Sequence, residues 1–254
     1  MKKGALFALL LVGLTAVVVG GAFLWPRRPW RAAVVVNERT LTAGELDLRA
    51  RALYEDARRV GRLSVPGRHL EEAQDYYRRR AAKMWIVKEV LLAEALTRGF
   101  TVSASDEKES LDQIAARLRG RNLTPEQFFR EGPLPEDLKR RDFWEGVLVD
   151  KFTAMEVRDK ISVTTREITE RQNELQRQAQ AQAKPGAPKV VVSRKKAIDS
   201  LRVERFRRGF RRLFRELYAK SDVKCPAFHD LETLDGVMPK RLGDSEPRTL
   251  AERP

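Results

Sequence analysis

The pattern of apolar and polar positions changes abruptly after residue 24. Residues 5–24 carry no charged side chain, and they lie between Lys2-Lys3 and Trp25. A helix of this length spans about 30 Å, the thickness of the hydrocarbon core of a bilayer. Trp25 stands where interfacial aromatic residues anchor a membrane span. The pattern therefore predicts that residues 1–30 hold one transmembrane or signal helix.

A retained anchor and a cleaved signal peptide both fit this segment. Small residues at Val19-Gly20-Gly21 offer a cleavage site, whereas the length of the apolar run favours an anchor. The short stub before the run and the tendency of long domains to translocate favour a cytoplasmic N-terminus. We expect a single-pass inner-membrane protein with a periplasmic body, or a soluble periplasmic protein after cleavage.

Beyond the anchor, strand signals precede a long series of helical ones. Residues 32–41 predict a short β hairpin or strand pair with its turn at Asn37. Thr42 and Glu45 have the spacing of a capping box, in which each side chain bonds the other residue's backbone amide. A helix is therefore expected over residues 43–60.

Residues 70–98 predict the most apolar helix of the body, which we expect at the centre of the core. Its apolar residues recur three or four apart on one face. They are Met84, Val87, Leu91 and Ala95, and Gly99 follows as a C-terminal stop.

Five more helices are expected from capping residues and apolar stripes. They begin at Ser103 or Ser105, at Pro125, at Glu136, at Thr164 or Thr165, and at Arg194; they end near Gly120, before Gly132, at Lys160, at Gln182 and at Lys220. The fold class is therefore expected to be mainly α.

The domain organisation follows from where these signals stop. Residues 31–183 should form one helical core, and residues 184–193 a Pro/Gly linker with a short strand at Val190 to Val192. A closing basic helix over 194–225 should pack on the core, with residues 34–36 pairing near residues 220–224. Residues 226–254 are polar, rich in proline and aperiodic, which predicts a disordered tail.

Charge is concentrated near the C-terminal end. The chain has a formal net charge of +14, and residues 194–224 hold twelve Lys or Arg against four Asp or Glu. Such a surface attracts anionic partners, so contact with anionic lipid is a candidate role, whereas nucleic acid is not expected outside the cytoplasm. An ordinary solvated face is the alternative. The candidate basic surface consists of Arg202, Arg205, Arg208, Arg211, Arg212 and Arg215.

No motif in the sequence indicates catalysis. Gly-rich phosphate loops, CxxC and HExxH are absent, and two His with one Cys cannot supply a structural zinc site. We therefore expect no enzyme activity, no cofactor and no metal. Cys225 cannot form an intramolecular disulfide, and it is either an unremarkable residue or a reactive or intermolecular thiol.

Several short motifs occur in an order that is more specific than any one of them alone. They are Val35-Val36-Asn37 before Leu41-Thr42; Gly99-Phe100-Thr101-Val102 after the long helix; Leu111-Asp112-Gln113-Ile114-Ala115; and Asn122-Leu123-Thr124-Pro125-Glu126-Gln127. Taken together they resemble the N-terminal chaperone module of the SurA/PpiD-type periplasmic foldases. Residues 161–164 resemble the exit into that family's next module, and residues 194–223 resemble its closing helix and return strand.

The resemblance implies a SurA N-terminal-like helical chaperone domain with a short strand pair. In that family, parvulin-type prolyl isomerase domains stand between the module and the closing helix, where this chain has only the Gln/Ala-rich stretch 170–193. The isomerase domain is therefore expected to be missing. His69 and His229 lie outside that stretch and are expected to be surface residues.

The function expected from the resemblance is that of a holdase for unfolded or nascent envelope proteins, outer-membrane proteins among them. Apolar groove contacts tolerate many sequences, because burial depends on area rather than on direction. Candidate groove residues are Phe128, Phe129, Trp144 and Phe152, for which ordinary core packing is the alternative. A non-catalytic scaffold or accessory subunit that binds one envelope partner is the alternative function.

Overall fold

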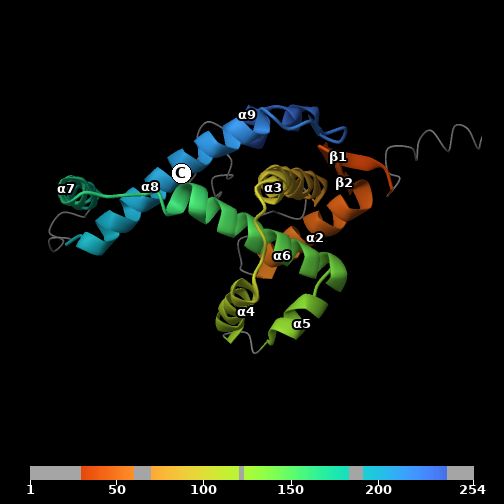
Figure 1. Cartoon of the computed structure of the whole chain (residues 1–254), viewed down its shortest axis with the longest axis horizontal. Coiled ribbons are helices and arrows are strands. Elements are labelled where there is room, and N and C mark those ends of the chain that lie inside the picture. The colour runs from red at the N-terminus through yellow and green to blue at the C-terminus, as the bar shows by residue number, and fades with distance from the viewer. Residues whose placement is uncertain (1–29, 60–69, 120–122, 183–190, 239–254) are drawn as a thin grey trace, which may run out of the picture. The chain divides into compact units, whose positions relative to one another are not determined.

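The computed structural model describes residues 30–59, 70–119, 123–182 and 191–238. This part of the chain is mainly helical and includes a small three-stranded antiparallel sheet (Figure 1), as predicted. The predicted anchor at residues 5–24, His69, the linker residues 184–190 and the end of the tail lie outside it. Among the helices that are described, none is both long and apolar enough to cross a membrane.

The chain divides into two compact units, and each is assembled from separate stretches of sequence. Unit 1 holds the described residues of Met1–Ile86, Arg130–Glu136 and Asp222–Pro254. Unit 2 holds those of Val87–Phe129 and Asp137–Ser221.

The sheet of unit 1 joins the two ends of the described chain. Strand β1 (Ala32–Val36) pairs with β2 (Arg39–Thr42) as the predicted hairpin, with Asn37 at a φ of 53° in its turn. Asparagine tolerates this left-handed conformation better than most residues. On its other edge, β1 pairs antiparallel with β3 (Val223–Lys224), so that Val36 lies opposite Val223. The pairing predicted between residues 34–36 and residues 220–224 is therefore confirmed.

The turn residue Asn37 also holds the end of β3 in register. Its backbone N–H donates to the carbonyl oxygen of Asp222 at 2.8 Å, and its side-chain Oδ1 accepts from the Asp222 N–H at 3.0 Å. One asparagine thus makes the hairpin turn and extends the hydrogen bonding of β1 to β3.

Two helices of unit 1 follow the hairpin. Helix α2 (Ala43–Arg59) opens with the predicted capping box, in which the Thr42 N–H donates to Glu45 and the Glu45 N–H donates to Thr42 Oγ1, each at 3.2 Å. Figure 1 shows β1 and β2 at the start of α2. Helix α3 (Leu70–Thr97) runs from unit 1 into unit 2, and Gly99 follows it at a φ of 74°, the predicted stop.

The apolar face predicted for α3 is only partly correct. Leu91 and Ala95 are buried, but Met84 is 54 % exposed and Val87 is half-buried. Buried residues occur on several sides of the helix between Ala81 and Ala95. The rule used for the prediction assumes one buried face, and a helix covered from several sides does not follow it.

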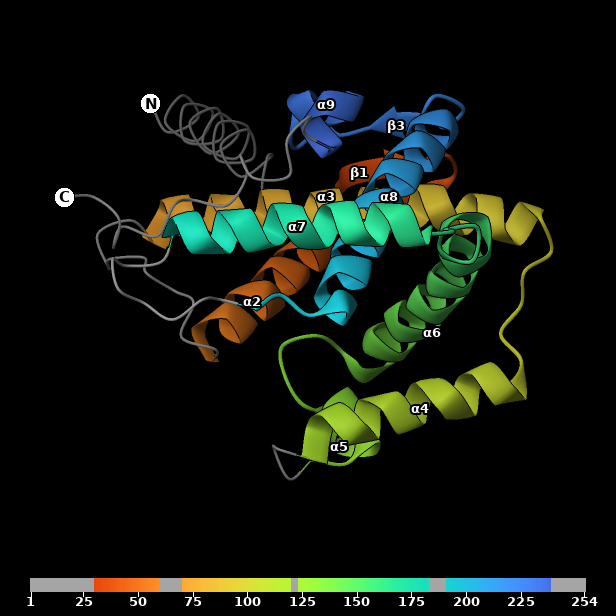
Figure 2. The same cartoon turned by 90° about the vertical axis from the view of Figure 1, so that its left-hand side faces the viewer.

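The prediction of a disordered tail is wrong for residues 226–238. A 3₁₀ helix, η4 (His229–Glu232), and a short helix, α9 (Leu234–Val237), follow β3, and Phe228, Leu231 and Val237 are buried. These few apolar residues lie too close together to produce a recognisable period, although they suffice to hold a short segment. Figure 2 shows β3 and α9 beside β1.

One arginine of α3 fastens this C-terminal segment within unit 1. A single guanidinium nitrogen of Arg79 hydrogen-bonds both carboxylate oxygens of Asp230, and the guanidinium carbon lies 4.9 Å from the centre of the Phe228 ring. An ion pair and a cation–π contact thus act on the same short segment.

Unit 2 contains the C-terminal part of α3 and the remaining helices. They are α4 (Ala104–Leu118), α5 (Pro125–Arg130), α6 (Glu136–Thr153), the π-helical turn η3 (Ala154–Arg158), α7 (Thr165–Gln182) and α8 (Arg194–Tyr218). The capping residues are Ser103 for α4, Thr124 for α5 and Thr164 for α7. The helix predicted over residues 136–160 is therefore interrupted by a π-helical turn.

The strand predicted at Val190 to Val192 is wrong for its two described residues. Neither Val191 nor Val192 belongs to a strand. Instead, the Val192 N–H donates to Gln176 Oε1 and its carbonyl oxygen accepts from Gln172 Nε2, each at 2.8 Å. Glutamine side chains of α7 thus satisfy the backbone groups that a neighbouring strand would otherwise have satisfied.

Lys88 joins α3 to α6 inside unit 2. Its Nζ lies 2.8 Å from Asp142 Oδ1, hydrogen-bonds Glu145, and lies 3.2 Å from Oε1 of the buried Glu89. Burial alone would lower the pKa of Lys88, but the hydrogen bonds to Asp142 and Glu145 outweigh it, so the pKa is raised above its ordinary 10.5.

Replacing Lys88 with Met should destabilise the protein by about 3–5 kcal/mol at neutral pH, because it removes a largely buried ammonium group that lies against three carboxylates. The deficit should narrow as the pH falls, since protonation of the carboxylates relieves their repulsion. In the wild type, the stabilisation from Lys88 is fully present below pH 10.5 and should be lost as the pH rises above it. Urea unfolding at several pH values measures both effects. Lys108→Met, at an exposed position of α4, is the control, and an equal loss in both variants would contradict the prediction.

Replacing Arg79 with Gln should loosen residues 226–238 while the rest of unit 1 stays folded. The ion pair and the ring contact are partly exposed and together contribute about 1 kcal/mol, so amide exchange in this segment should rise about fivefold. Arg80→Gln removes the same charge from a neighbouring exposed position and serves as the control. Equal exchange rates in the two variants would show that the contact with Asp230 does not hold the segment.

Candidate binding groove

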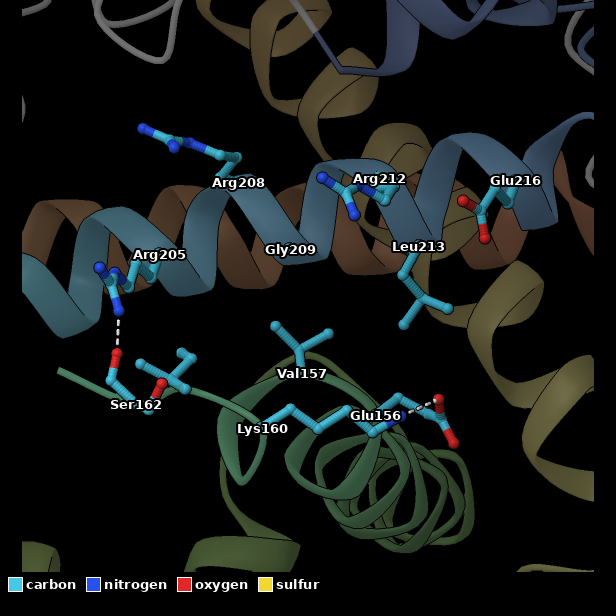
Figure 3. A pocket seen from close by; sticks show the side chains of 11 residues that line it. Glu156, Val157, Lys160, Ser162, Arg205, Arg208, Gly209, Arg212, Leu213 and Glu216 are labelled. Atoms are coloured by element: carbon cyan, nitrogen blue, oxygen red, sulfur yellow. Dashed lines mark hydrogen bonds and ion pairs between the residues drawn. The ribbon is translucent and has the colours of Figure 1, made fainter.

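An open groove in unit 2 lies between α8 on one side and η3 with the residues after it on the other. Its floor is apolar and consists of Val157, Ile161 and Leu213. Figure 3 looks at these two sides, with the side chain of Val157 directed toward Gly209 of α8. Helices α7 and α8 pack against each other, and η3 packs against α8, so three consecutive elements form this part of unit 2 (Figure 2).

Gly209 allows η3 to approach α8 closely. A Cβ atom at this position would lie 2.7 Å from Val157 Cγ1, well inside the distance that such atoms adopt. Since Val157 is buried and branched at Cβ, it cannot move away easily. The groove floor therefore requires a glycine inside an otherwise arginine-rich helix.

Arg205 ties α8 to the start of α7. Its guanidinium donates to the carbonyl oxygen of Ser162 and to the carboxylate of Glu167. Glu167 also accepts from the N–H and hydroxyl of Thr164, each at 2.8 Å, and these hydrogen bonds, with the charge of Arg205, lower the pKa of Glu167. This arginine is therefore largely engaged in holding the fold.

Besides Arg205, the charged residues that line the groove are Glu156, Lys160, Arg208, Arg212 and Glu216. Lys160 lies 2.8 Å and Arg98 lies 3.0 Å from Glu156, and the hydrogen bond from Lys160 is the main reason for the lowered pKa of Glu156. On α8, the groove is lined by Arg208, Arg212 and Glu216. No described residue pairs with the Arg212 guanidinium, although Glu216 stands four residues further along the same helix.

The structure places the six predicted surface arginines differently from one another. Arg205, Arg208 and Arg212 line the groove. Arg202 and Arg215 are exposed and do not line it, and Arg211 is half-buried. The wall opposite α8, from Glu156 to Ser162, was not predicted from the sequence. The one available signal was Gly209, because an isolated glycine in a helix often marks the close approach of another segment.

The four candidate client-binding aromatics also separate into two pairs. Phe129 and Phe152 are 1 % and 0 % exposed, so the prediction that they line a client groove is wrong for this structure. Phe152 packs edge-on against Phe100 with ring centres 5.4 Å apart. Phe128 and Trp144 are half-buried and remain accessible in part. Both belong to a run of ring contacts between α5 and α6 that passes from Phe128 through Phe129 and Phe143 to Trp144.

The residue types that most often carry out chemistry or bind metals show no sign of such a role in the described residues. Cys225 is buried, and burial raises the pKa of its thiol to about 11, which keeps it protonated and unreactive at neutral pH. His229 is exposed, as predicted. Within the four described segments, no three His, Cys, Asp or Glu residues come together as a metal site would require.

Comparison with known proteins adds no assignment. The chain matches no protein-family model, and no curated protein sequence matches it.

Replacing Gly209 with Ala should destabilise the protein, whereas Gly146→Ala in α6 should stabilise it. Alanine in a helix interior gains about 0.5–1 kcal/mol over glycine, and a Cβ at Gly146 meets nothing within 4 Å. At Gly209 the contact with Val157 should cost about 1–3 kcal/mol through overpacking and outweigh that gain. Thermal or urea unfolding measures both variants.

A double-mutant cycle of Gly209→Ala with Val157→Ala tests whether contact with Val157 causes the destabilisation. If the Val157 side chain is the obstacle, the double variant should be more stable than the sum of the single effects by about 1 kcal/mol. A Gly209→Ala variant as stable as Gly146→Ala would contradict the close approach of η3 to α8.

Proposed function

We propose that the protein is a membrane-anchored periplasmic chaperone, a holdase that binds unfolded exported or outer-membrane proteins and has no prolyl isomerase activity. The observation that carries this proposal is the pairing of β1 with β3. The resemblance to the SurA/PpiD-type chaperone module implies that a return strand after the closing helix reaches the N-terminal strand. The described chain has this arrangement of strands.

The order of the helices also supports the proposal. A hairpin, a capped helix, a long helix ending at Gly99 and two capped helices beginning at Ala104 and Pro125 follow one another as the resemblance implies. Fold order alone does not specify function. The proposal therefore also needs a surface on which an unfolded chain could bind.

The half-buried aromatic run on α5 and α6 is the best candidate for that surface. Phe128, Phe143 and Trp144 expose part of their rings, and the buried Phe129 lies among them. Lys139 stabilises the end of this run, because its Nζ lies 4.6 Å from the centre of the Phe128 ring and 2.6 Å from the Phe128 carbonyl oxygen. A fixed apolar surface of this kind binds unfolded segments by area rather than by sequence.

The absence of isomerase activity is proposed from the length of one connection. Residues 183–193 are all that separates α7 from α8, and the resemblance would place the isomerase domains at this point. Eleven residues cannot form such a domain. The anchor at residues 5–24, with a cytoplasmic N-terminus, belongs to the proposal, and cleavage to a soluble periplasmic protein is its alternative.

The full chain, reconstituted in nanodiscs of zwitterionic lipid, should suppress the aggregation of an unfolded outer-membrane protein and of an unrelated unfolded protein at near-stoichiometric ratio. Trp144→Ala should weaken the suppression about tenfold, because a ring that loses its contact with the client forfeits about 1.4 kcal/mol or more. Trp30→Ala, at a 68 % exposed tryptophan before β1, is the matched control. Light scattering follows aggregation, and thermal unfolding checks that both variants fold.

Failure to suppress aggregation of either client would overturn the holdase proposal. The alternative would then be a non-catalytic scaffold or accessory subunit with one specific envelope partner, which crosslinking in cells followed by purification would identify.

A further inference from the structure

We infer that the groove between η3 and α8 binds acidic, apolar stretches of unfolded chains, and that it thereby gives the protein a preference for anionic clients. This inference rests on the proposed holdase function and specifies its substrate class. The aromatic surface on α5 and α6 would bind without regard to charge, whereas this groove would select by charge.

The floor of the groove accounts for the apolar part of the ligand. Val157 is buried, and Ile161 and Leu213 are half-buried, so their accessible atoms form an apolar strip between two polar walls. A side chain such as Leu that enters this strip leaves water and meets carbon atoms on both sides. Gly209 lets the Val157 side chain approach α8, and the side chain of Leu213 projects from α8 on the same side (Figure 3).

The rim accounts for the acidic part of the ligand. Four cations line the groove, Lys160, Arg205, Arg208 and Arg212, against two acids, Glu156 and Glu216. Glu156 already accepts from Lys160 and Arg98, and Arg205 is bound to Ser162 and Glu167. The cations with capacity for a ligand are therefore Arg208 and Arg212.

These two arginines can engage a carboxylate at little cost. Arg212 pairs with no described residue. Arg208 pairs with Glu204 of its own helix at 3.0 Å, but its side chain is 72 % exposed, and ion pairs this exposed contribute little, so a ligand carboxylate can replace Glu204. Charge-assisted hydrogen bonds from guanidinium groups to carboxylates are strong and directional. Glu216 opposes them as the one acid of the rim without a described partner, and it can instead accept a backbone N–H of the bound chain.

The surrounding field also favours an anionic ligand. Residues 194–218, which form α8, contain ten Lys or Arg and three Asp or Glu, a net charge of +7. A concave site beneath such a helix concentrates anions and speeds their association.

A peptide fits the groove better than a bilayer surface does. Arg208 and Arg212 lie on one wall of a hollow whose floor is apolar and whose opposite wall is η3 with the residues after it. A narrow extended chain can place one side chain on the floor and the next against the arginines. Lipid head groups in a flat surface would contact the outer arginines of α8, Arg202 and Arg215, as readily as those of the groove.

The test measures peptide binding by fluorescence anisotropy with the full chain in zwitterionic nanodiscs. The probe is a short labelled peptide of alternating Leu and Glu. One comparison peptide has Lys in place of each Glu, and the other has Ser in place of each Leu. Arg208→Gln with Arg212→Gln should weaken binding of the Leu/Glu peptide about tenfold or more. Arg202→Gln with Arg215→Gln, which removes the same charge outside the groove, should leave the affinity nearly unchanged.

Three results would overturn the inference. Equal loss in the two double variants would mean that binding follows the overall charge of α8. Equal affinity for the Leu/Glu peptide and for either comparison peptide would show that the groove does not prefer acidic, apolar stretches. Loss of peptide binding when anionic lipid is added to the nanodiscs would mean that lipid head groups occupy the groove. Thermal unfolding of each double variant ensures that a loss does not reflect misfolding.

The same variants separate this inference from the function on which it rests. If the wild type suppresses aggregation and Arg208→Gln with Arg212→Gln protects acidic clients equally well, the groove inference is wrong and the holdase stands. If the wild type protects no client, the holdase is wrong, and the anisotropy result alone decides whether the groove binds acidic peptides.

Discussion

The pairing of β1 with β3 is the constraint on which the described fold depends. The two strands are separated by about three quarters of the chain, yet Val35 and Val36 lie opposite Lys224 and Val223. Unit 1 is therefore closed by its last strand, and most of unit 2 is inserted between its first and last elements. Bringing distant strands together costs loop entropy that only the completed contacts offset. The double hydrogen bond of Asn37 with Asp222 supplies part of that offset.

In unit 2, a concave surface is formed by helices joined by short connections. The π-helical turn η3 interrupts the regular course of α6 at Ala154, and such turns often occur at functional sites. Gly209 then allows the turn to approach α8. Glutamines of α7 satisfy the backbone of Val192 just before α8 begins. The groove is thus a consequence of backbone geometry, and side chains determine its apolar floor and its charge.

Local signals in the sequence predicted most helix starts, because capping depends on residues three positions apart. Thr42 with Glu45 and Thr124 with Gln127 form the expected reciprocal hydrogen bonds, and the structure shows the same pair at Thr164 and Glu167. Apart from the pairing of β1 with β3, the sequence did not reveal the contacts between residues that are distant along the chain. Phe129 and Phe128 are adjacent, yet only Phe129 is fully buried. The order in residues 226–238 and the groove wall at η3 likewise depend on contacts that no local pattern encodes.

Closure by the last strand has a consequence for biosynthesis. The 187 residues from Asn37 to Val223 take about 10–40 s to translate at typical rates. Throughout that interval the β1 edge that later receives β3 has no partner of its own chain, and an open strand edge is a template for pairing with other chains. The β3 strand of a second copy of this chain has the sequence that this edge accepts. Domain-swapped dimers would then arise during synthesis rather than from the finished protein.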